Sequence, residues 1–306
     1  MKKISLLPLA ILVFTTLSFA HDGKHYSNYN TRNSDSDNCQ DHVNMYSDDQ
    51  PERARSEETV TLANQPLTVT ASRNCGIHVK NWDKQEFSVK ICRVAAAKTE
   101  SEAQQLLGRI KLKEQNGTLT VEGPEKSDGD DYSWSTVLLI KAPVGSTMNL
   151  NAHNGGISLS GVSANVTAHT QNGGISLKET AGKMNVEAHN GGISIKDCGG
   201  DVTANVQNGG LSIELAENWN GTGLNAKTQN GGLVVSIPKN FQSSLEVASA
   251  GHSGMMCQAE ACEGGQRTWD DNGRIFKIGS STPVIHASTV NGGIVIKSRG
   301  HDRGEI

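Results

Sequence analysis

Histidine and aspartate side chains near the start of the chain are the first groups that could do chemistry, because together they can bind a divalent metal ion. His21, His25 and His42 lie there among several aspartates. Their spacing follows none of the regular patterns by which zinc ligands are presented. A solvated polar segment explains these residues better than a metal site.

Three further histidines occur in a polar repeat in the middle of the chain. His153 and His189 occupy the same position two repeats apart, which corresponds to about 9.6 Å at the usual spacing between strands. That distance is too long for two ligands of one zinc ion. His169 occupies a neighbouring position, and a solvated face again explains the group better. We therefore predict no catalytic residue, no metal site and no cofactor.

Six cysteines could form disulfides if the protein is exported. Cys75 and Cys92 are 17 positions apart, close to one 18-residue repeat, so we predict a bridge between them. Cys257 and Cys262 flank a four-residue stretch and are predicted to form a local bridge. Two cysteines remain, for which a bridge to the N-terminal segment and an unpaired thiol are both open: Cys39 and Cys198.

Composition limits the partners and the kind of core. The chain has 28 Lys and Arg against 32 Asp and Glu, a net charge of −4, so no basic surplus is available to neutralise phosphates. Nucleic acid is excluded as a predicted partner. With only 4 Trp, 4 Tyr and 5 Phe in 306 residues, the core must be narrow and aliphatic.

Residues 1–20 have the three parts of a signal peptide. Lys2 and Lys3 precede an apolar run that is short for a membrane of about 30 Å, and Ala20 offers a small residue at the cleavage point. We predict an exported protein, periplasmic or extracellular, with no membrane insertion after cleavage. Residues 21–58 are polar and are predicted to be a flexible tail.

The elements that must position any functional side chain come from an internal repeat. Asn-Gly-Gly followed by Ile or Leu occurs six times, and the first three intervals are 18 residues each. These predicted corners are Asn154, Gly155, Gly156, Asn172, Gly173, Gly174, Asn190, Gly191, Gly192, Asn208, Gly209, Gly210, Asn230, Gly231, Gly232, Asn291, Gly292 and Gly293.

Apolar residues alternate with polar ones on both sides of each corner, so each repeat contains two short strands. One such unit buries too little apolar area to be stable, whereas stacked units close their backbone ladders and share one core. The sequence therefore predicts an all-β fold, a single-stranded β-solenoid (β-helix) of about 18-residue coils over residues 59–298. We expect positive φ at the corner glycines and hydrogen bonds between stacked corner asparagines.

Three departures from the repeat are predicted. Residues 101–107 read as a short helix in an N-terminal coil, with Thr99 and Glu102 as a capping box. Residues 251–274 read as an inserted loop. The charged tail 299–306 is predicted to guard the open end of a last rung formed by residues 294–296.

The Asn-Gly-Gly copies and the stretch 76–83 resemble the bacterial putative-adhesin and head-GIN type β-strand-repeat families of unknown function. The likeness covers residues of about 60 to 298. It implies an exported, non-enzymatic β-solenoid and brings no functional residues with it.

Two functions remain open on the sequence. The first is a non-catalytic binding, adhesion or scaffold module of the bacterial cell envelope, with an unknown envelope glycan or protein as partner. The alternative is a carbohydrate-active β-helix enzyme with an unrecognised site. The outward positions of the repeat are mostly neutral and lack the clustered Asp with Arg or Lys that such enzymes use, so we favour the binding module. The sequence leaves the oligomeric state open.

Overall fold

The computed structural model describes the core of the chain and most of its loops. The described residues are 28–30, 36–46, 52–71, 74–125, 131–217, 219, 221–241, 243–250, 254–270, 273–279, 282 and 284–300. The predicted signal peptide and residues 301–306 lie outside them. Among the described residues, the helices are all too short or too polar to span a bilayer.

Five successive repeats each fold into a longer and a shorter strand, and the coils stack in parallel. Partners one coil apart are 18 residues apart in the first repeats, as in Val166 opposite Met184 and Ile175 opposite Ile193. The strands are β10 (Thr147–Ala152), β11 (Ile157–Ser160), β12 (Asn165–Asn172), β13 (Ile175–Lys178), β14 (Lys183–Asn190), β15 (Ile193–Lys196), β16 (Asp201–Asn208), β17 (Leu211–Glu214), β18 (Gly223–Asn230) and β19 (Leu233–Ile237).

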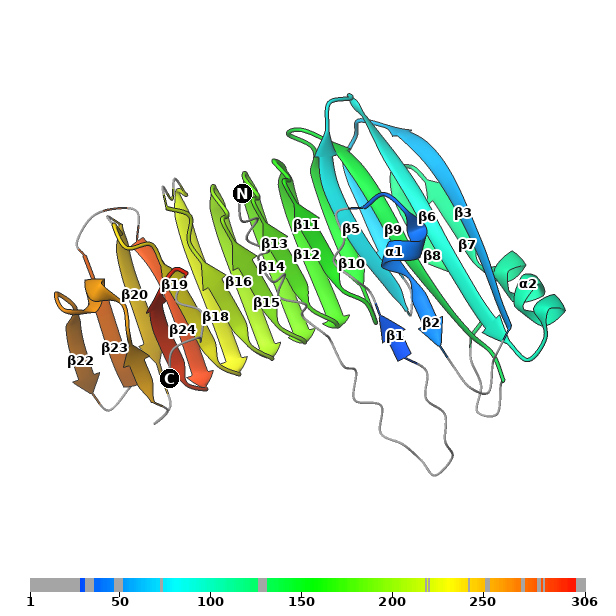
Figure 1. Ribbon diagram of the computed structural model, residues 1–306. Helices are drawn as coiled ribbons and strands as arrows, with labels where there is room; N and C mark the ends of the chain where they lie inside the picture. The colour runs from blue at the N-terminus through cyan, green and yellow to red at the C-terminus, as the bar shows by residue number, and fades with distance from the viewer. Residues whose placement is uncertain are drawn as a thin grey trace, which may run out of the picture.

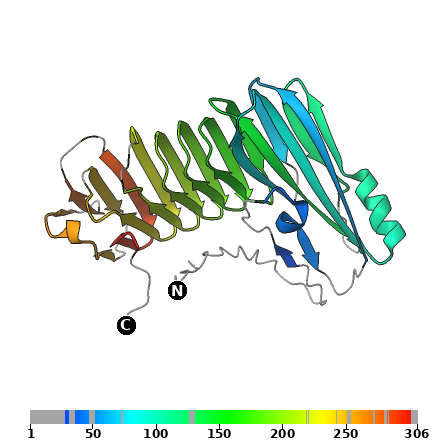
Figure 2. The ribbon, with the colours of Figure 1, turned by 45° about the horizontal axis from the view of Figure 1, so that its top comes forward.

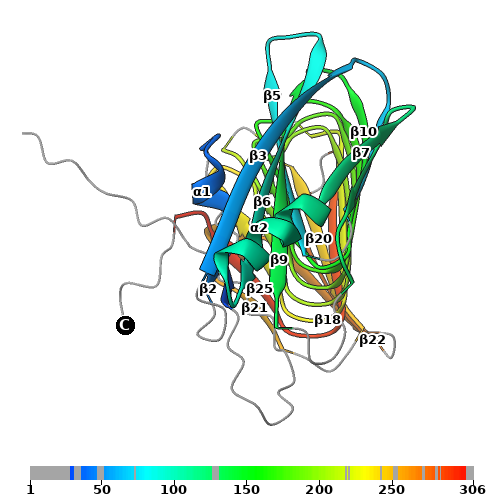
Figure 3. The same cartoon turned by 90° about the vertical axis from the view of Figure 1, so that its right-hand side faces the viewer.

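Two sheets enclose the core of an elongated molecule (Figures 1 and 3). We call sheet 1 the sheet that contains β10, β12, β14, β16 and β18, and sheet 2 the sheet that contains β11, β13, β15, β17 and β19. Inward residues alternate along every strand; Val166, Ala168, Ile175 and Leu177 are all at most 3% exposed. The chain is therefore all-β and solenoid-like, with a thin aliphatic core that needs few aromatic rings.

The N-terminal end is broader and departs from simple coils. Its helix α2 (Glu100–Arg109) has the expected capping box between Thr99 and Glu102, and it buries Leu106 and Leu107 at the end of the core. Its strands are β3 (Glu52–Ala63), β4 (Leu67–Ala71), β5 (Cys75–Trp82), β6 (Glu86–Ala97), β7 (Lys111–Gln115), β8 (Thr118–Glu122) and β9 (Ser133–Pro143).

Strand β6 is antiparallel to both of its neighbours, β3 and β9. The chain turns back after β5 instead of completing a coil, and β9 then lies between β5 and β6. The expectation that residues 21–58 form a flexible tail is wrong for residues 52–58, which belong to β3, and for residues 36–46, which dock on the outer face of sheet 2. The polar composition of this segment was misleading because β3 is an edge strand in which Ala54 is the one buried residue and most others are exposed.

The C-terminal end is interleaved. Strands β20 (Ser244–Ser249) and β21 (Met255–Cys257) precede β24 (Val284–Asn291) and β25 (Ile294–Ser298) in sequence. In space β24 lies between β18 and β20, and β25 lies between β19 and β21 (Figure 1). Residues 294–296 are therefore paired on both sides, and the prediction that the tail after them guards an open end is wrong.

The segment predicted as an inserted loop extends the sheets. It contains β21, the 3-10 helix η1 (Glu260–Cys262) and the strand β22 (Gln266–Asp270), which pairs with β23 (Gly273–Ile278). Strand β23 pairs with β20, so this hairpin forms the end of sheet 1. Figure 2 shows the parallel coils between this hairpin and the broad N-terminal end.

The first glycine of each corner is needed for a close backbone approach. A Cβ on Gly173 would lie 2.3 Å from the carbonyl oxygen of Gly155, and one on Gly191 would lie 2.1 Å from that of Gly173. The expectation of positive φ is wrong there, since of the glycines in these corners only Gly209 has a positive φ, and its 158° is close to extended backbone. Left-handed residues occur instead at the opposite corner, as in Glu179 with φ 53°.

The corner asparagines form a side-chain ladder. Asn172 donates from Nδ2 to Oδ1 of Asn154 at 2.9 Å, and Asn190 donates to Asn172 in the same way. Every later member donates to the preceding one, up to Asn291 donating to Asn230 at 2.9 Å. The ladder satisfies the polar groups that the stacked corners bring together.

Candidate functional site

The outer face of sheet 1 is the most regular exposed surface in the described coils. Outward side chains alternate with buried ones along five strands, and the three columns nearest the Asn-Gly-Gly corners contain fifteen residues that are all exposed or half-buried. We call these three columns the amide face; their residues are Asn149, Asn151, His153, Thr167, His169, Gln171, Asn185, Glu187, His189, Thr203, Asn205, Gln207, Asn225, Lys227 and Gln229. A fourth outward column, at the start of the strands, contains the charged pair Lys183 and Asp201 on neighbouring strands.

The amide face is almost uncharged. Glu187 and Lys227 are its carboxylate and its amine, and Glu187 lies next to the His169 ring, with 3.8 Å between Oε2 and Nδ1. Both side chains are about half exposed, so this contact contributes little to stability. Amides, hydroxyls and imidazoles make up the rest of the face.

Side chains of this kind both donate and accept hydrogen bonds. Because parallel strands repeat every 4.8 Å or so, the same donors and acceptors recur along the solenoid axis. Such an array matches a polar polymer with its own regular repeat better than a single compact ligand. The face thus offers a ligand a regular set of hydrogen-bond donors and acceptors.

The structure separates the histidines as the sequence predicts. His153 directly follows β10 and His189 lies in β14, with β12 between these two strands. The described residues contain no group of three His, Cys, Asp or Glu that could hold a metal ion. The histidines of the amide face are solvated hydrogen-bonding groups.

The predicted bridge between Cys75 and Cys92 is wrong. Cys92 is bonded to Cys39, and Cys75 is a buried free thiol. Strand β9 separates the two strands, and Cys75 faces the main core whereas Cys92 packs in a second apolar cluster on the opposite face of sheet 2. Burial raises the pKa of the Cys75 thiol to about 12.

The other cysteines divide between one bridge and one thiol. Cys257 and Cys262 are bonded, with 6.1 Å between their Cα atoms. Cys198 is a buried free thiol whose Sγ lies 3.0 Å from Oγ1 of Thr180, and burial raises its pKa.

Sequence reasoning missed a docked segment on the outer face of sheet 2. Residues 36–46, which we call the N-terminal clasp, contain helix α1 (Cys39–His42) and strand β2 (Asn44–Tyr46). The ring of His42 packs edge-on against His78 of β5, with 4.7 Å between centroids. Cys39 was the one residue in this segment that suggested docking. Its disulfide partner could not be predicted without knowing where β6 lies in the sheet.

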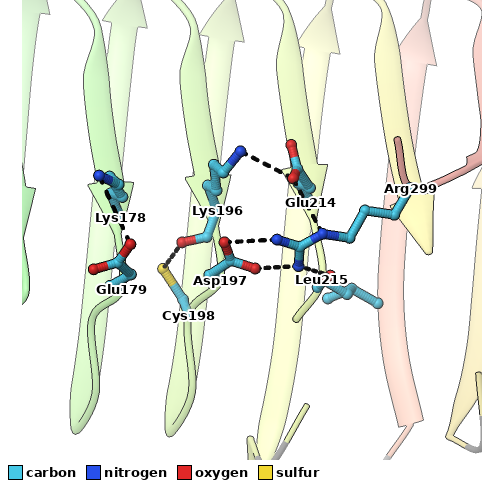
Figure 4. Close-up of polar contacts among 8 residues, drawn as sticks. All are labelled: Lys178, Glu179, Lys196, Asp197, Cys198, Glu214, Leu215 and Arg299. Atoms are coloured by element: carbon cyan, nitrogen blue, oxygen red, sulfur yellow. Dashed lines mark hydrogen bonds and ion pairs between the residues drawn. The ribbon is translucent and has the colours of Figure 1, made fainter. Parts of the chain in front are cut away.

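A second missed feature is an ionic cluster on the flank of the coils (Figure 4). Arg299 follows the last strand and donates to both carboxylate oxygens of Asp197 and to the carbonyl oxygen of Leu215. Its Nε also lies 3.4 Å from Oε1 of Glu214. These charges raise the pKa of Arg299, so the cluster is a fixed ion pair between distant coils.

The fold and its corners define the class of protein, an all-β solenoid-like chain of stacked Asn-Gly-Gly coils. The chain belongs to the Toastrack DUF4097 family, whose model matches residues 27–296. This is an adhesin-like family of unknown function. No curated protein matches the sequence.

Solved structures similar to the chain include three bacterial proteins. A putative cell adhesion protein from Clostridium sporogenes is 15% identical over 80% of this chain and 100% of its own, with a TM-score of 0.33. A putative adhesin from Bacteroides fragilis is 9% identical over 79% of this chain and 97% of its own (TM-score 0.37). A putative adhesin from Parabacteroides merdae is 11% identical over 80% of this chain and 96% of its own (TM-score 0.35).

Proposed function

We propose that the protein is an exported, non-catalytic adhesion or scaffold module of the cell envelope that binds a polar polymer along the amide face. The observation that carries the proposal is the regular array of neutral donors and acceptors on five consecutive strands. Membership of an adhesin-like family supports the same class of function.

The array suits a repeating ligand because each single contact on an exposed surface is weak. A hydrogen bond there contributes about 1 kcal/mol, since it replaces a bond to water. A polymer that engages several strands at once gains by multivalency, because every contact after the first is intramolecular. The few charges on this side of the sheet balance, with Lys183 opposite Asp201 and Glu187 offset by Lys227, which favours a neutral polymer, such as an uncharged glycan, over an anionic one.

The proposal is tested by sedimentation of the mature chain with insoluble peptidoglycan and by retention on immobilised neutral and anionic polysaccharides. We expect retention on at least one neutral polymer and no release of reducing ends. A variant carrying Asn149→Asp, Asn185→Asp and Asn225→Asp keeps the side-chain shapes and adds charge to one column of the face. Binding should fall at least tenfold.

A matched variant carries Ser158→Asp, Ser176→Asp and Ser194→Asp, three half-buried residues on the outer face of sheet 2. It adds the same net charge to the other sheet, on strands β11, β13 and β15, and should bind as the parent does. If both variants lost binding equally, the cause would be net charge. If both variants bound as the parent does, the amide face would not be the binding site. Turnover of a polysaccharide that one carboxylate substitution abolishes would contradict a non-catalytic function.

A further inference from the structure

The N-terminal clasp is fastened to sheet 2 by contacts of several kinds. Cys39 is bonded to Cys92 of β6, across 53 residues of sequence. Nζ of Lys141 on β9 lies 2.6 Å from Oδ2 of Asp37, and Nη1 of Arg55 on β3 donates to the carbonyl oxygen of Val43 at 2.9 Å. Three strands therefore hold one short segment.

The surface under the clasp is apolar, although it is the outer face of a sheet. Val43 inserts into a cluster separate from the main core and is only 2% exposed. The sheet residues of this cluster are Cys92, Val94, Ala96, Val137 and Leu139, all at most 9% exposed. On the outer face of β11, β13, β15 and β17 the outward residues are instead serine, lysine or glutamate, so the apolar patch is built to be covered.

The disulfide borders a cavity of about 300 Å³. Asn38, Gln40, Arg55 and Glu57 line it together with both half-cystines. The two sulfurs differ in burial, since Cys39 is partly exposed whereas Cys92 is only 1% exposed. A thiol that enters the cavity meets Cys39 first.

We propose that the Cys39–Cys92 bridge is a thiol–disulfide exchange site that latches the clasp over the apolar patch of β6 and β9. Its substrate class is a dithiol, such as the Cys-x-x-Cys site of a thiol oxidoreductase. The inference is independent of the proposed binding by the amide face, which lies on the other sheet.

The exchange proceeds in two balanced steps. A thiolate of the dithiol attacks Sγ of Cys39, the bond between the two sulfurs breaks, and its electron pair goes to Sγ of Cys92, which takes up a proton. The second thiolate then attacks the mixed disulfide and releases Cys39 as a thiol. The dithiol is oxidised to a disulfide, and the bridge is reduced to two thiols.

Release follows because little else in the segment is stable alone. Helix α1 has four residues, far fewer than an isolated helix needs in water. The contacts with Asp37 lie at an exposed surface, where ion pairs contribute little. Reduction should therefore free residues 36–46 and expose the apolar patch to solvent.

The test uses the full mature chain under native conditions. We expect a soluble Cys-x-x-Cys protein, and dithiothreitol in a parallel arm, to make Cys39 and Cys92 reactive to alkylation, as measured by mass spectrometry. Backbone hydrogen exchange in peptides covering 36–46 should then rise at least tenfold, with no change over β12 to β18. Binding of an apolar dye should rise together with exchange.

The second bridge provides an internal control, because Cys257 and Cys262 are only five positions apart and close a short loop at the far end. The variant Cys39→Ser should show the exchange of the reduced protein without any reductant, whereas the double variant Cys257→Ser and Cys262→Ser should exchange over 36–46 as the parent does. Unchanged protection of 36–46 after both latch thiols are alkylated would overturn the proposal. Resistance of the latch to the dithiol while the Cys257–Cys262 bridge is reduced would overturn it as well.

Discussion

Arg299 and Asp197 are in contact although 102 residues separate them, with 3.0 Å between Nη2 and Oδ2. The pair joins the end of the last strand to a coil near the middle of the solenoid (Figure 4). Arg299 also donates to Leu215, whose carbonyl oxygen belongs to the next coil. The ionic cluster therefore holds the interleaved C-terminal end against two coils that come earlier in the sequence.

Removing this cation should destabilise the protein moderately. The side chains of Arg299 and Asp197 are 24% and 18% exposed, so water screens the pair in part. We expect Arg299→Met to lower the free energy of unfolding by about 1 kcal/mol. Denaturant unfolding measures the change, with Arg109→Met on the exposed side of α2 as the control. An equal effect of the two substitutions would contradict the role of the cluster.

The two glycines of a corner should respond differently to alanine. A Cβ on Gly173 would meet a carbonyl oxygen at 2.3 Å, whereas one on Gly210 would meet its nearest neighbour at 3.7 Å. We expect Gly173→Ala to cost roughly 2–4 kcal/mol, because the stacked backbones must separate, and Gly210→Ala to cost far less. Thermal unfolding of both variants distinguishes close approach from a general preference for glycine, which predicts equal losses.

The opposite corner offers a stabilising change. Glu179 has φ 53°, a conformation that glycine adopts without strain. We expect Glu179→Gly to raise the free energy of unfolding by about 0.5–1 kcal/mol. The same substitution at Glu187, inside β14, should lower it by a similar amount. If both substitutions lowered the free energy of unfolding, the left-handed backbone of Glu179 would not be strained.

The asparagine ladder has a direction, which aspartate can reveal. Asn190 both donates to Asn172 and accepts from Asn208, whereas Asn154 accepts in the ladder. Aspartate keeps the acceptor and loses the donor. We therefore expect Asn190→Asp to cost about 1 kcal/mol and Asn154→Asp to be nearly neutral at pH 7. The reverse order of the two losses would mean that the bonds run the other way.

Acid should weaken the docking of the clasp. Burial, then the neighbouring His42 and the positive charge of Lys80, lower the pKa of His78 below its usual 6.5. Undocking lets His78 take up a proton below that pH, so the docked form is fully stable above about pH 6.5 and loses stability as the pH falls below it.

Hydrogen exchange of residues 36–46 between pH 7.5 and 5, corrected for intrinsic rates, measures this loss. The other charged groups at the site are Asp37 on the clasp, Lys80 on β5, Lys90 on β6 and Lys141 on β9. His78→Gln should flatten the pH dependence, and His153→Gln on the amide face should leave it as in the parent. A dependence that survives His78→Gln would assign it to another group.

Much of the fold could be predicted because the repeat determines it. Asn154, Asn172 and Asn190 recur every 18 residues, and a period that matches the strand alternation allows only stacked coils. The amide face follows from the same alternation. The features that could not be predicted depend on pairing between distant segments. The local sequence does not indicate that β6 runs antiparallel to its neighbours, and this direction places Cys92 next to Cys39.

The order of the last coils escaped for a related reason. The corner at Asn291 has the same Asn-Gly-Gly motif as the corner at Asn230, so the motif does not reveal that β20 and β21 lie further along the solenoid axis. The expected positive φ at the corner glycines was wrong. Glycine is required there because the backbone of the neighbouring coil comes too close for a Cβ atom, a requirement that has the same effect on the sequence as a left-handed backbone.

The interleaved end sets a limit on how the protein can be made. A simple solenoid can fold coil by coil as its chain emerges, since each coil needs only the one before it. Here β20 and β21 are synthesised before β24 and β25, the strands that pair them with β18 and β19. Until residues 284–298 have been synthesised, an incomplete chain therefore has an unpaired edge on each sheet. The chain from β20 to β25 must therefore close in one late, non-local step, and a chain stalled before that step is the form most exposed to mispairing with another copy.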